Sequence, residues 1–422
     1  MVGQVAISGS KNAVLPILAA CLLTDEDCKL KNVPRIDDVH IMLQLLERIG
    51  ASVEWLDPHQ LRVNASGLAG GDVLASLASR MRASFLLMGP LLARRGEARV
   101  AKPGGDDIGM RRVEQHLLGL RLMGASVELE GNEFVARADR LKGATIHLDM
   151  PTVTGTENLM MAAVTAEGIT TINNAAREPH VCDLALFLEK MGARIRGIGT
   201  DVIQIDGVSE LSGATHRVIP DNIEAGTYAF AIAATGGDAE VTEVETADLG
   251  MVIRKLRDAG VTVKDRGRAL RVAGDGRLHF VDVTTWPHPG FPTDLQAPFV
   301  SLMTQAEGRS VVSEAVFENR FQHVPELRKL GADIYVEGRS AIVSGPSQLH
   351  GGSVSVPDIR SGAALVVAAL CARGTTELEN VFHLDRGYED LVGKLEGLGA
   401  VVRRIEGGAD ELRPDLSKVV GD

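Results

Sequence analysis

Aromatic residues, cysteine pairs and long apolar runs are scarce in this chain of 422 residues. Aromatic side chains make up only 4% of it, so aliphatic side chains and alanine must fill the interior. No run of 18 apolar residues occurs, and residues 1–10 lack the basic and apolar stretches of an export signal, so we expect neither a membrane span nor secretion. The four cysteines form no CxxC pair and lie beside apolar residues, which predicts reduced, buried thiols in a cytoplasmic protein.

Basic residues are also fewer than acidic ones. Lys and Arg number 44 against 56 Asp and Glu, and the net charge of −12 argues against a nucleic-acid partner, because phosphate backbones need basic surfaces. His323 and Glu326 could share a helix face, but two ligands do not make a metal site. Gly197 and Gly199 lack the third glycine of a dinucleotide site, and no Gly-Lys-Ser/Thr follows the glycines of residues 102–109. We therefore expect no metal and no cofactor.

The chain does contain an internal repeat. An amphipathic stretch, a glycine, a small or apolar residue and a run of alternating strand-like residues recur six times, at intervals of roughly seventy residues. The glycines that mark the repeat are Gly50, Gly124, Gly192, Gly260, Gly331 and Gly399. Six units of this size account for nearly the whole chain.

The first unit shows the local plan. Asp37 or Asp38 can cap a helix whose apolar face recurs with a period of about 3.6 residues as far as Ile49. Gly50 then ends the helix in a left-handed conformation, and alternating apolar residues on either side of a turn at 57–58 predict a hairpin. The sixth unit repeats the plan, with Asp385 as the cap and Gly399 as the end.

Each unit also contains a helix that is apolar nearly all round, which indicates burial on most sides. These helices are expected at 13–23, 83–93, 157–166, 224–234, 295–305 and 362–372. Three units packed around their buried helices make an α/β domain of about two hundred residues, and two such domains fit the length. We place the first domain at 11–218, with a mobile loop at 102–112, and the second at 1–10 plus 219–422, with a loosely held tail after Gly407.

Helix starts are where chemistry is expected, because unpaired backbone N–H groups there attract anions. Several predicted starts carry a cation in place of a plain cap: Lys11 with Asn12, Arg82 and Arg360 in the apolar helices, and Arg111 with Arg112, Arg320 and Arg386 in the amphipathic ones. A surface accident is the simpler explanation for any one of them. Six equivalent placements favour a shared cleft in which the cations hold phosphate and carboxylate groups.

Two acidic positions stand out against these cations. Asp294 follows Phe291-Pro292-Thr293 at a predicted helix start, where it is either an N-cap or a general base that faces the cleft. Asp106 lies in a glycine-rich stretch at 102–109, which is either a plain surface loop or a mobile lid that carries an acid.

Several motifs together resemble those of the UDP-N-acetylglucosamine 1-carboxyvinyltransferases, a family of enolpyruvyl transferases. They run in order through nearly the whole chain, at residues 7–13 (ISGSKNA), 81–84 (MRAS), 176–179 (AREP), 291–294 (FPTD), 317–321 (FENRF) and 385–389 (DRGYE). The resemblance implies two domains, each an inside-out α/β barrel of three βαβαββ repeats. That architecture agrees with the six units found in the sequence.

The resemblance also implies a reaction. The 3′-hydroxyl of UDP-N-acetylglucosamine attacks C2 of phosphoenolpyruvate while C3 is protonated, and the tetrahedral intermediate then loses phosphate to leave an enolpyruvyl ether, the first committed step toward peptidoglycan. Carried over by motif, Asp294 takes the hydroxyl proton, and phosphoenolpyruvate is held by Lys11, Asn12, Arg111, Arg320, Arg360 and Arg386. The nucleotide sugar is contacted by Asn12, Arg82, Arg111, Arg112, Val113, Glu114, Gln115, Thr152, Val153, Asp294 and Val316.

Three features depart from the family pattern. Asp106 stands at the loop position that is usually cysteine, Arg112-Val113-Glu114 replaces a more usual Pro, apolar residue and Asp, and the few residues before Lys11 predict a short or missing first strand in the second domain. An ordinary thiol has a pKa of about 8.5 and a carboxyl about 3.9, so Asp106 can act as an acid only if its pKa is raised, which bound phosphoenolpyruvate would do. Asp106 also lacks the sulfur that fosfomycin alkylates, so resistance to that epoxide is expected.

Two other functions fit part of the pattern. A sister enzyme that acts on shikimate 3-phosphate shares the fold, but its usual signatures are absent around Lys11 and Arg82. A non-catalytic nucleotide-sugar-binding relative would not need the complete set of Lys11, Arg111, Asp294, Arg360 and Arg386. Enolpyruvyl transfer to the nucleotide sugar, by a monomer or a weak homo-oligomer, is therefore the favoured prediction.

Overall fold

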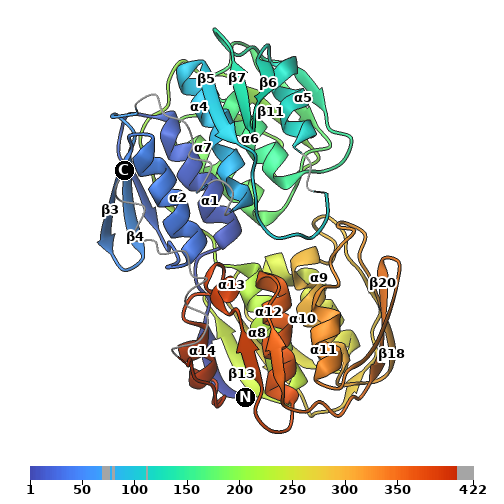
Figure 1. Ribbon diagram of the computed structural model, residues 1–422. Coiled ribbons are helices and arrows are strands. Elements are labelled where there is room, and N and C mark those ends of the chain that lie inside the picture. The colour runs from blue at the N-terminus through green and yellow to red at the C-terminus, as the bar shows by residue number, and fades with distance from the viewer. Residues whose placement is uncertain (69–76, 78–80, 111–112, 406–422) are drawn as a thin grey trace.

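The computed structural model describes residues 1–68, 77, 81–110 and 113–405, and it forms two lobes joined near the middle of the molecule (Figure 1). One large hydrophobic core holds buried residues between Ala13 and Val218, and the other holds Val5, Ile7 and buried residues between Ile223 and Leu398. The N-terminus therefore lies in the lobe formed mainly by the second half of the chain. Among the described residues, no helix is long and apolar enough to cross a membrane.

The helices of the two lobes follow the predicted alternation of a buried and an amphipathic helix. Those of the first lobe are α1 (Lys11–Ala20), α2 (Asp37–Arg48), α4 (Met88–Arg95), α5 (Glu114–Leu122), α6 (Val153–Ala163) and α7 (Pro179–Lys190). Those of the second are α8 (Asn222–Ala234), α9 (Gly250–Asp258), α10 (Gln296–Met303), α11 (His323–Lys329), α12 (Ile359–Cys371), α13 (Phe382–Asp385) and α14 (Leu391–Gly397). The apolar helices α8, α10 and α12 pack against one another, and in the first lobe α6 packs against both α4 and α1. In the second unit a 3₁₀ segment (Arg82–Leu87) precedes α4, because Pro90 has no N–H to donate back to Leu86.

The strands form one sheet for each unit. In the first lobe the sheet orders are β12 (Thr215–Arg217), β2 (Cys28–Lys31), β4 (Gln60–Asn64), β3 (Ser52–Asp57); β5 (Glu97–Ala101), β7 (Glu133–Arg137), β6 (Ser126–Glu130); and β8 (Thr145–His147), β9 (Ile169–Asn173), β11 (Val202–Asp206), β10 (Arg194–Arg196). In the second they are β1 (Val2–Ala6), β13 (Asp238–Thr242), β15 (Ala269–Ala273), β14 (Thr262–Asp265); β16 (Leu278–His279), β18 (Ala306–Ser313), β20 (Ser340–Gly345), β19 (Asp333–Glu337), with β17 (Val283–Thr284) beside β18; and β21 (Ser353–Ser355), β22 (Glu377–Glu379).

These sheets are mixed, and their parallel edges link the units. The parallel neighbour of β2 is β12 from the end of the same lobe, and the parallel neighbour of β13 is β1 from the chain start. The remaining pairs in each four-stranded sheet are mainly antiparallel, as hairpins require. The first strand of the second lobe was expected to be short or missing, but β1 pairs with β13 along all five of its residues.

The repeat glycines behave as predicted. All six have positive φ values, between 83° and 106°, at Gly50, Gly124, Gly192, Gly260, Gly331 and Gly399. A strand follows the glycine in five units, but residues 399–405 form none, so the hairpin expected after Gly399 is wrong for the described part of the chain. Val401 and Ile405 are exposed there and pack into no sheet face that would favour a strand.

Two predicted helix caps are also wrong. Ile36 precedes α2, and Asp37 and Asp38 both lie within its first turn, where the helix dipole favours acids without a side-chain cap. Asp385 ends the short helix α13, and Asp390 caps α14 by accepting from the N–H of Gly393 at 3.2 Å. At α14 the chain offers two acids, Asp385 and Asp390, and local spacing does not decide which one caps.

Candidate active site

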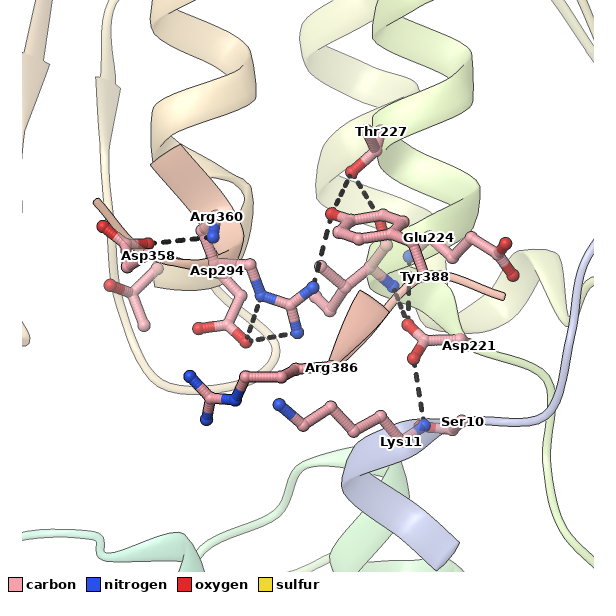
Figure 2. A network of polar contacts seen from close by, with 12 residues as sticks. Ser10, Lys11, Asp221, Glu224, Thr227, Asp294, Asp358, Arg360, Arg386 and Tyr388 are labelled. Carbon is pink, nitrogen blue, oxygen red and sulfur yellow. Dashed lines mark hydrogen bonds and ion pairs between the residues drawn. The ribbon is translucent and has the colours of Figure 1, made fainter. Parts of the chain in front are cut away.

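Three buried helices begin at the boundary between the lobes. Their caps are ordinary polar residues: Ser10 for α1, Asp221 for α8 and Asp358 for α12. The predicted cations Lys11 and Arg360 follow these caps and do not replace them, so the backbone N–H groups are satisfied and the cationic side chains can extend away. Figure 2 shows Lys11, Arg386 and Arg360 reaching toward the same region from different elements.

Asp294 lies between two arginines. Its Oδ1 is 2.6 Å from Arg320 Nη2, and its Oδ2 is 3.1 Å from Arg360 Nε and 3.0 Å from Arg360 Nη2. Burial opposes its ionised form, but Arg360 and Arg320 outweigh that effect and hold the pKa of Asp294 well below its usual range. Asp294 caps no helix, which removes the alternative reading of this position. A quarter of its side chain is exposed, so a bound molecule can reach it.

A second carboxylate, Asp38, also lies between two cations. Its Oδ2 is 2.8 Å from Lys11 Nζ, and its Oδ1 is 2.9 Å from Arg386 Nε. Burial opposes ionisation here too, and Lys11 and Arg386 lower the pKa of Asp38 below its ordinary value. Burial also lowers the pKa of Lys11, an effect that Asp38 opposes. The sequence pattern identified Asp38 only as a possible cap and missed this role.

The predicted lid reaches the second lobe. Arg386 Nη1 lies 2.5 Å from Asp106 Oδ1, so the loop acid meets a cation predicted to hold phosphoenolpyruvate. The N–H of Met110 donates to Glu318 Oε1 at 2.5 Å, and the N–H of Asn319 donates to the carbonyl of Ile108 at 3.2 Å. Arg386 follows α13 at its C-terminal end, where the helix dipole favours a cation, and not at a helix start as predicted.

Polar contacts from the fourth unit, which the sequence analysis had left without a role, hold these groups. The N–H of Lys11 donates to Asp221 Oδ2 at 3.1 Å, which ties α1 to the start of α8. Arg360 Nη1 donates to the hydroxyl of Tyr388 at 3.3 Å, and that hydroxyl lies 3.0 Å from Thr227 Oγ1 (Figure 2). The sequence gives Asp221 and Thr227 no special role, because their partners Lys11 and Tyr388 are 210 and 161 positions away and leave no local pattern.

Glu314 is a further residue that the sequence analysis missed. It is buried and accepts hydrogen bonds from Thr293 Oγ1 at 2.9 Å and from the backbone N–H groups of Val316 and Phe317 at 2.8 and 2.9 Å. It therefore fixes the residue before Asp294 and the predicted sugar contact Val316 in one arrangement. A second hydroxyl, Thr285 Oγ1, donates to the Glu314 carboxylate at 2.8 Å.

The predicted nucleotide-sugar residues of the first lobe gather at two neighbouring helix starts. Val113 precedes α5, Glu114 and Gln115 begin it, and Thr152 caps α6, which starts at Val153. Gln115 Nε2 donates to Asp149 Oδ2 at 2.7 Å, which joins the two starts.

Two more members of the predicted set lie in the first lobe. Asn12 is partly exposed in the first turn of α1. Arg82 begins the 3₁₀ segment before α4 and lies near His116 on α5, whose pKa is lowered to about 3 by burial and, to a smaller extent, by Arg82. Arg111 and Arg112 lie outside the described residues.

The chain as a whole is matched by known proteins. The profile of the EPSP synthase (3-phosphoshikimate 1-carboxyvinyltransferase) family matches residues 1–395, and the chain belongs to that family. It is 50% identical over 409 residues to UDP-N-acetylglucosamine 1-carboxyvinyltransferase of Granulibacter bethesdensis, covering 96% of this chain and 97% of the relative. It is 49% identical over 405 residues to UDP-N-acetylglucosamine 1-carboxyvinyltransferase 1 of Carboxydothermus hydrogenoformans, covering 96% of each. Within the family the chain thus falls among the UDP-N-acetylglucosamine 1-carboxyvinyltransferases.

Solved structures agree with the fold. The enolpyruvyl transferase NikO from Streptomyces tendae superposes with a TM-score of 0.85 at 26% identity, over 96% of both chains. An EPSP synthase from Acinetobacter baumannii superposes with a TM-score of 0.72 at 20% identity, over 94% of this chain and 95% of that one, which speaks for the fold alone.

Proposed function

We propose that this protein transfers the enolpyruvyl group of phosphoenolpyruvate to the 3′-hydroxyl of UDP-N-acetylglucosamine and releases phosphate. The observation that carries the proposal is a group of ion pairs at one boundary between the lobes: Arg360 with Asp294, Arg386 with Asp106, and Lys11 with Asp38, which Arg386 also contacts. Full-length relatives named for this activity support it at 47 to 50% identity. The product is a precursor of peptidoglycan.

Phosphoenolpyruvate carries a phosphate and a carboxylate, and the cations are suited to both. Lys11 is a compact point charge, whereas Arg360 and Arg386 are planar forks that pair with oxyanions through two N–H groups. Arg320 stays with Asp294 and Thr293, so it shapes the wall of the site. Arg111, outside the described residues, would complete the anion site. These cations would offset the charge that develops as phosphate departs.

Asp294 would take the proton of the attacking 3′-hydroxyl. Paired with two arginines it is a weak base, since both partners favour its ionised form. The anionic substrate would compete for Arg360, weaken one of the two pairs and so raise the proton affinity of Asp294 when the reactants are assembled. Substrate binding would in this way prepare the base.

Asp106 would supply the proton to C3 of phosphoenolpyruvate. Its ion pair with Arg386 favours the carboxylate form, which cannot donate. Phosphoenolpyruvate competing for Arg386 would remove that stabilisation and add negative charge nearby, and both changes favour a protonated Asp106. Binding of phosphoenolpyruvate would then raise the proton affinity of both Asp106 and Asp294.

The nucleotide sugar would lie along the first lobe. Asn12, Arg82, Thr152 and Val153 would contact it, and Val316, held by Glu314, would meet it from the second lobe. The diphosphate and uridine would lie over the start of α5, at Val113, Glu114 and Gln115 with the preceding Arg111 and Arg112. The backbone N–H groups at this helix start, together with Arg111 and Arg112, would suit a diphosphate.

We propose the same division of the chain as the sequence suggested, with domains at 11–218 and at 1–10 plus 219–422, each an inside-out α/β barrel. The two separate cores support the division. All four cysteines are free thiols, which supports a reducing, cytoplasmic location, although only Cys21 and Cys28 are buried as predicted and Cys182 and Cys371 are partly exposed. We propose further that the protein acts as a monomer or a weak homo-oligomer.

A two-acceptor assay tests this function. Purified protein is mixed with phosphoenolpyruvate and either UDP-N-acetylglucosamine or shikimate 3-phosphate, while released phosphate and product mass are recorded. We expect phosphate and an enolpyruvyl adduct with the nucleotide sugar only. Release with shikimate 3-phosphate alone would establish the sister reaction, and release with neither would indicate a non-catalytic binding protein.

A further inference from the structure

Asp38 differs from the other acids of the site in its burial and in its partners. Its side chain is 3% exposed, and each oxygen is occupied, Oδ2 by Lys11 Nζ at 2.8 Å and Oδ1 by Arg386 Nε at 2.9 Å. Arg386 Nη2 approaches Oδ2 as well, at 3.5 Å. A substrate therefore meets the two cations and not the carboxylate behind them.

The two partners come from different lobes. Lys11 opens α1 and Asp38 lies in the first turn of α2, both in the first lobe, whereas Arg386 follows α13 in the second. The pair between Asp38 and Arg386 spans 348 positions of the chain. One buried carboxylate thus sets where a cation from each lobe stands relative to the other.

The same carboxylate limits how strongly the site can attract anions. Lys11 and Arg386 together carry two positive charges, and a neighbouring buried negative charge cancels part of their field at the substrate position. A bound phosphate must share both cations with Asp38. Phosphate is also a product that has to leave, so some cancellation serves turnover.

We propose that Asp38 is a positioning residue that aligns Lys11 with Arg386 across the lobes and restrains the affinity of this cation pair for phosphate. The inference rests on the proposed function, because it assigns Lys11 and Arg386 to the phosphate-bearing substrate. Asp38 takes no part in proton transfer, since no reactant reaches it.

Asp38→Asn tests the proposal because it preserves size but removes the charge. The amide keeps only one of the two acceptor oxygens, and its NH₂ group faces the other cation, so we expect kcat to fall by at least about tenfold. Loss of the cancelling charge should at the same time tighten binding of inorganic phosphate by about three- to tenfold, measured by calorimetric titration of the otherwise ligand-free enzyme. Slower turnover with tighter phosphate binding is a combination that a loosened structure does not produce.

Two further variants sharpen the test. Asp37→Asn removes the neighbouring acid from the same helix turn, and both readings should stay within about twofold of the wild type. Asp38→Glu keeps the charge but displaces it by one methylene, so kcat should fall while phosphate binding does not tighten. If Asp38→Asn fails to fold, Asp38→Glu still decides, because wild-type turnover in that variant would exclude positioning.

Wild-type kcat in Asp38→Asn, or weaker phosphate binding than in the wild type, would overturn the proposal. The phosphate titration needs no catalysis, so it decides the matter even if the wild type transfers no enolpyruvyl group. In that event the function fails, and tighter phosphate binding in Asp38→Asn would still support the role of Asp38 in the cation pair.

Discussion

Asp38 and Asp294 are each held by two cations, yet they differ in reach and in connectivity. Asp294 has a quarter of its side chain exposed and pairs with Arg320 and Arg360 of its own lobe. Asp38 is 3% exposed and joins a cation from each lobe. Similar charge environments lower the pKa of both, so ionisation alone does not distinguish a reacting carboxylate from a supporting one. The two carboxylates are distinguished by whether a substrate can reach them.

The largest expected effect comes from Asp294. Asp294→Asn keeps the size of the side chain but cannot accept the hydroxyl proton, so kcat should fall by about 10³-fold. Steady-state phosphate release in the presence of both substrates measures it, and thermal unfolding checks that the fold persists. If kcat of Asp294→Asn falls by less than about tenfold, Asp294 is not the base, and it does not differ from Asp38 in its role.

Asp106→Cys tests the lid acid. The wild type should keep its activity after incubation with fosfomycin, whereas the variant should be inactivated covalently, since only a thiolate attacks the epoxide. A general acid fails as the pH rises through its pKa, and a carboxyl titrates below a thiol, so the wild-type rate should fall at lower pH than that of the variant. Coincident pH–rate profiles, or rapid inactivation of the wild type, would contradict the assignment.

The charge around Lys11 predicts a pH effect on phosphate binding. Burial lowers the pKa of Lys11, Asp38 opposes that shift, Arg386 and Arg360 add to it, and Asp106 opposes it weakly. Phosphate affinity should therefore decline with rising pH below the ordinary titration range of lysine, as the ammonium loses its proton. Asp38→Asn should move this decline to lower pH by removing the neighbour that favours the charged form.

Calorimetric titrations across the alkaline range would show the shift, with Asp37→Asn as the reference. If phosphate affinity declines at the same pH in the wild type, Asp38→Asn and Asp37→Asn, Lys11 is not the group that titrates.

The smallest expected effect concerns the contact between the lid and the second lobe. Glu318→Gln replaces a charged acceptor for the N–H of Met110 by a neutral one, a difference of about 1 kcal/mol, so KM for phosphoenolpyruvate should rise about fivefold with kcat little changed. Glu337→Gln, at an exposed position of β19, is the control and should match the wild type. Equal KM values for both variants would argue that this contact does not hold the lid.

Sequence periodicity predicted the repeating parts of this fold well. The left-handed glycines Gly50 and Gly399 and the buried helix at 224–234 follow from local spacing, and the structure confirms them. The hairpin after Gly399 was wrong, because a strand needs a partner sheet that a single unit does not reveal. Lys11 and Arg360 were found by their unusual places near helix starts, where the structure has them.

Long-range partners could not be found in the same way. In the sequence Asp38 resembles a helix cap, because nothing local shows its partner Arg386, which is 348 positions away. Glu314 gives no signal either, because its two hydroxyl donors, Thr293 and Thr285, are 21 and 29 positions away. A single sequence records spacing along the chain, whereas these roles depend on contacts between lobes and units. Arg386 was recognised as a cation of interest but assigned to the wrong end of a helix.

Infrared difference spectroscopy tests most directly whether Asp294, which a substrate can reach, takes up the proton while the buried Asp38 does not. Spectra are recorded as enzyme with both substrates forms the tetrahedral intermediate, in an Asp106→Cys background so that the lid carboxyl adds no band. The account predicts a new protonated-carboxyl band that disappears in Asp294→Asn and persists in Asp38→Asn. A band that survives in Asp294→Asn and disappears in Asp38→Asn would contradict it.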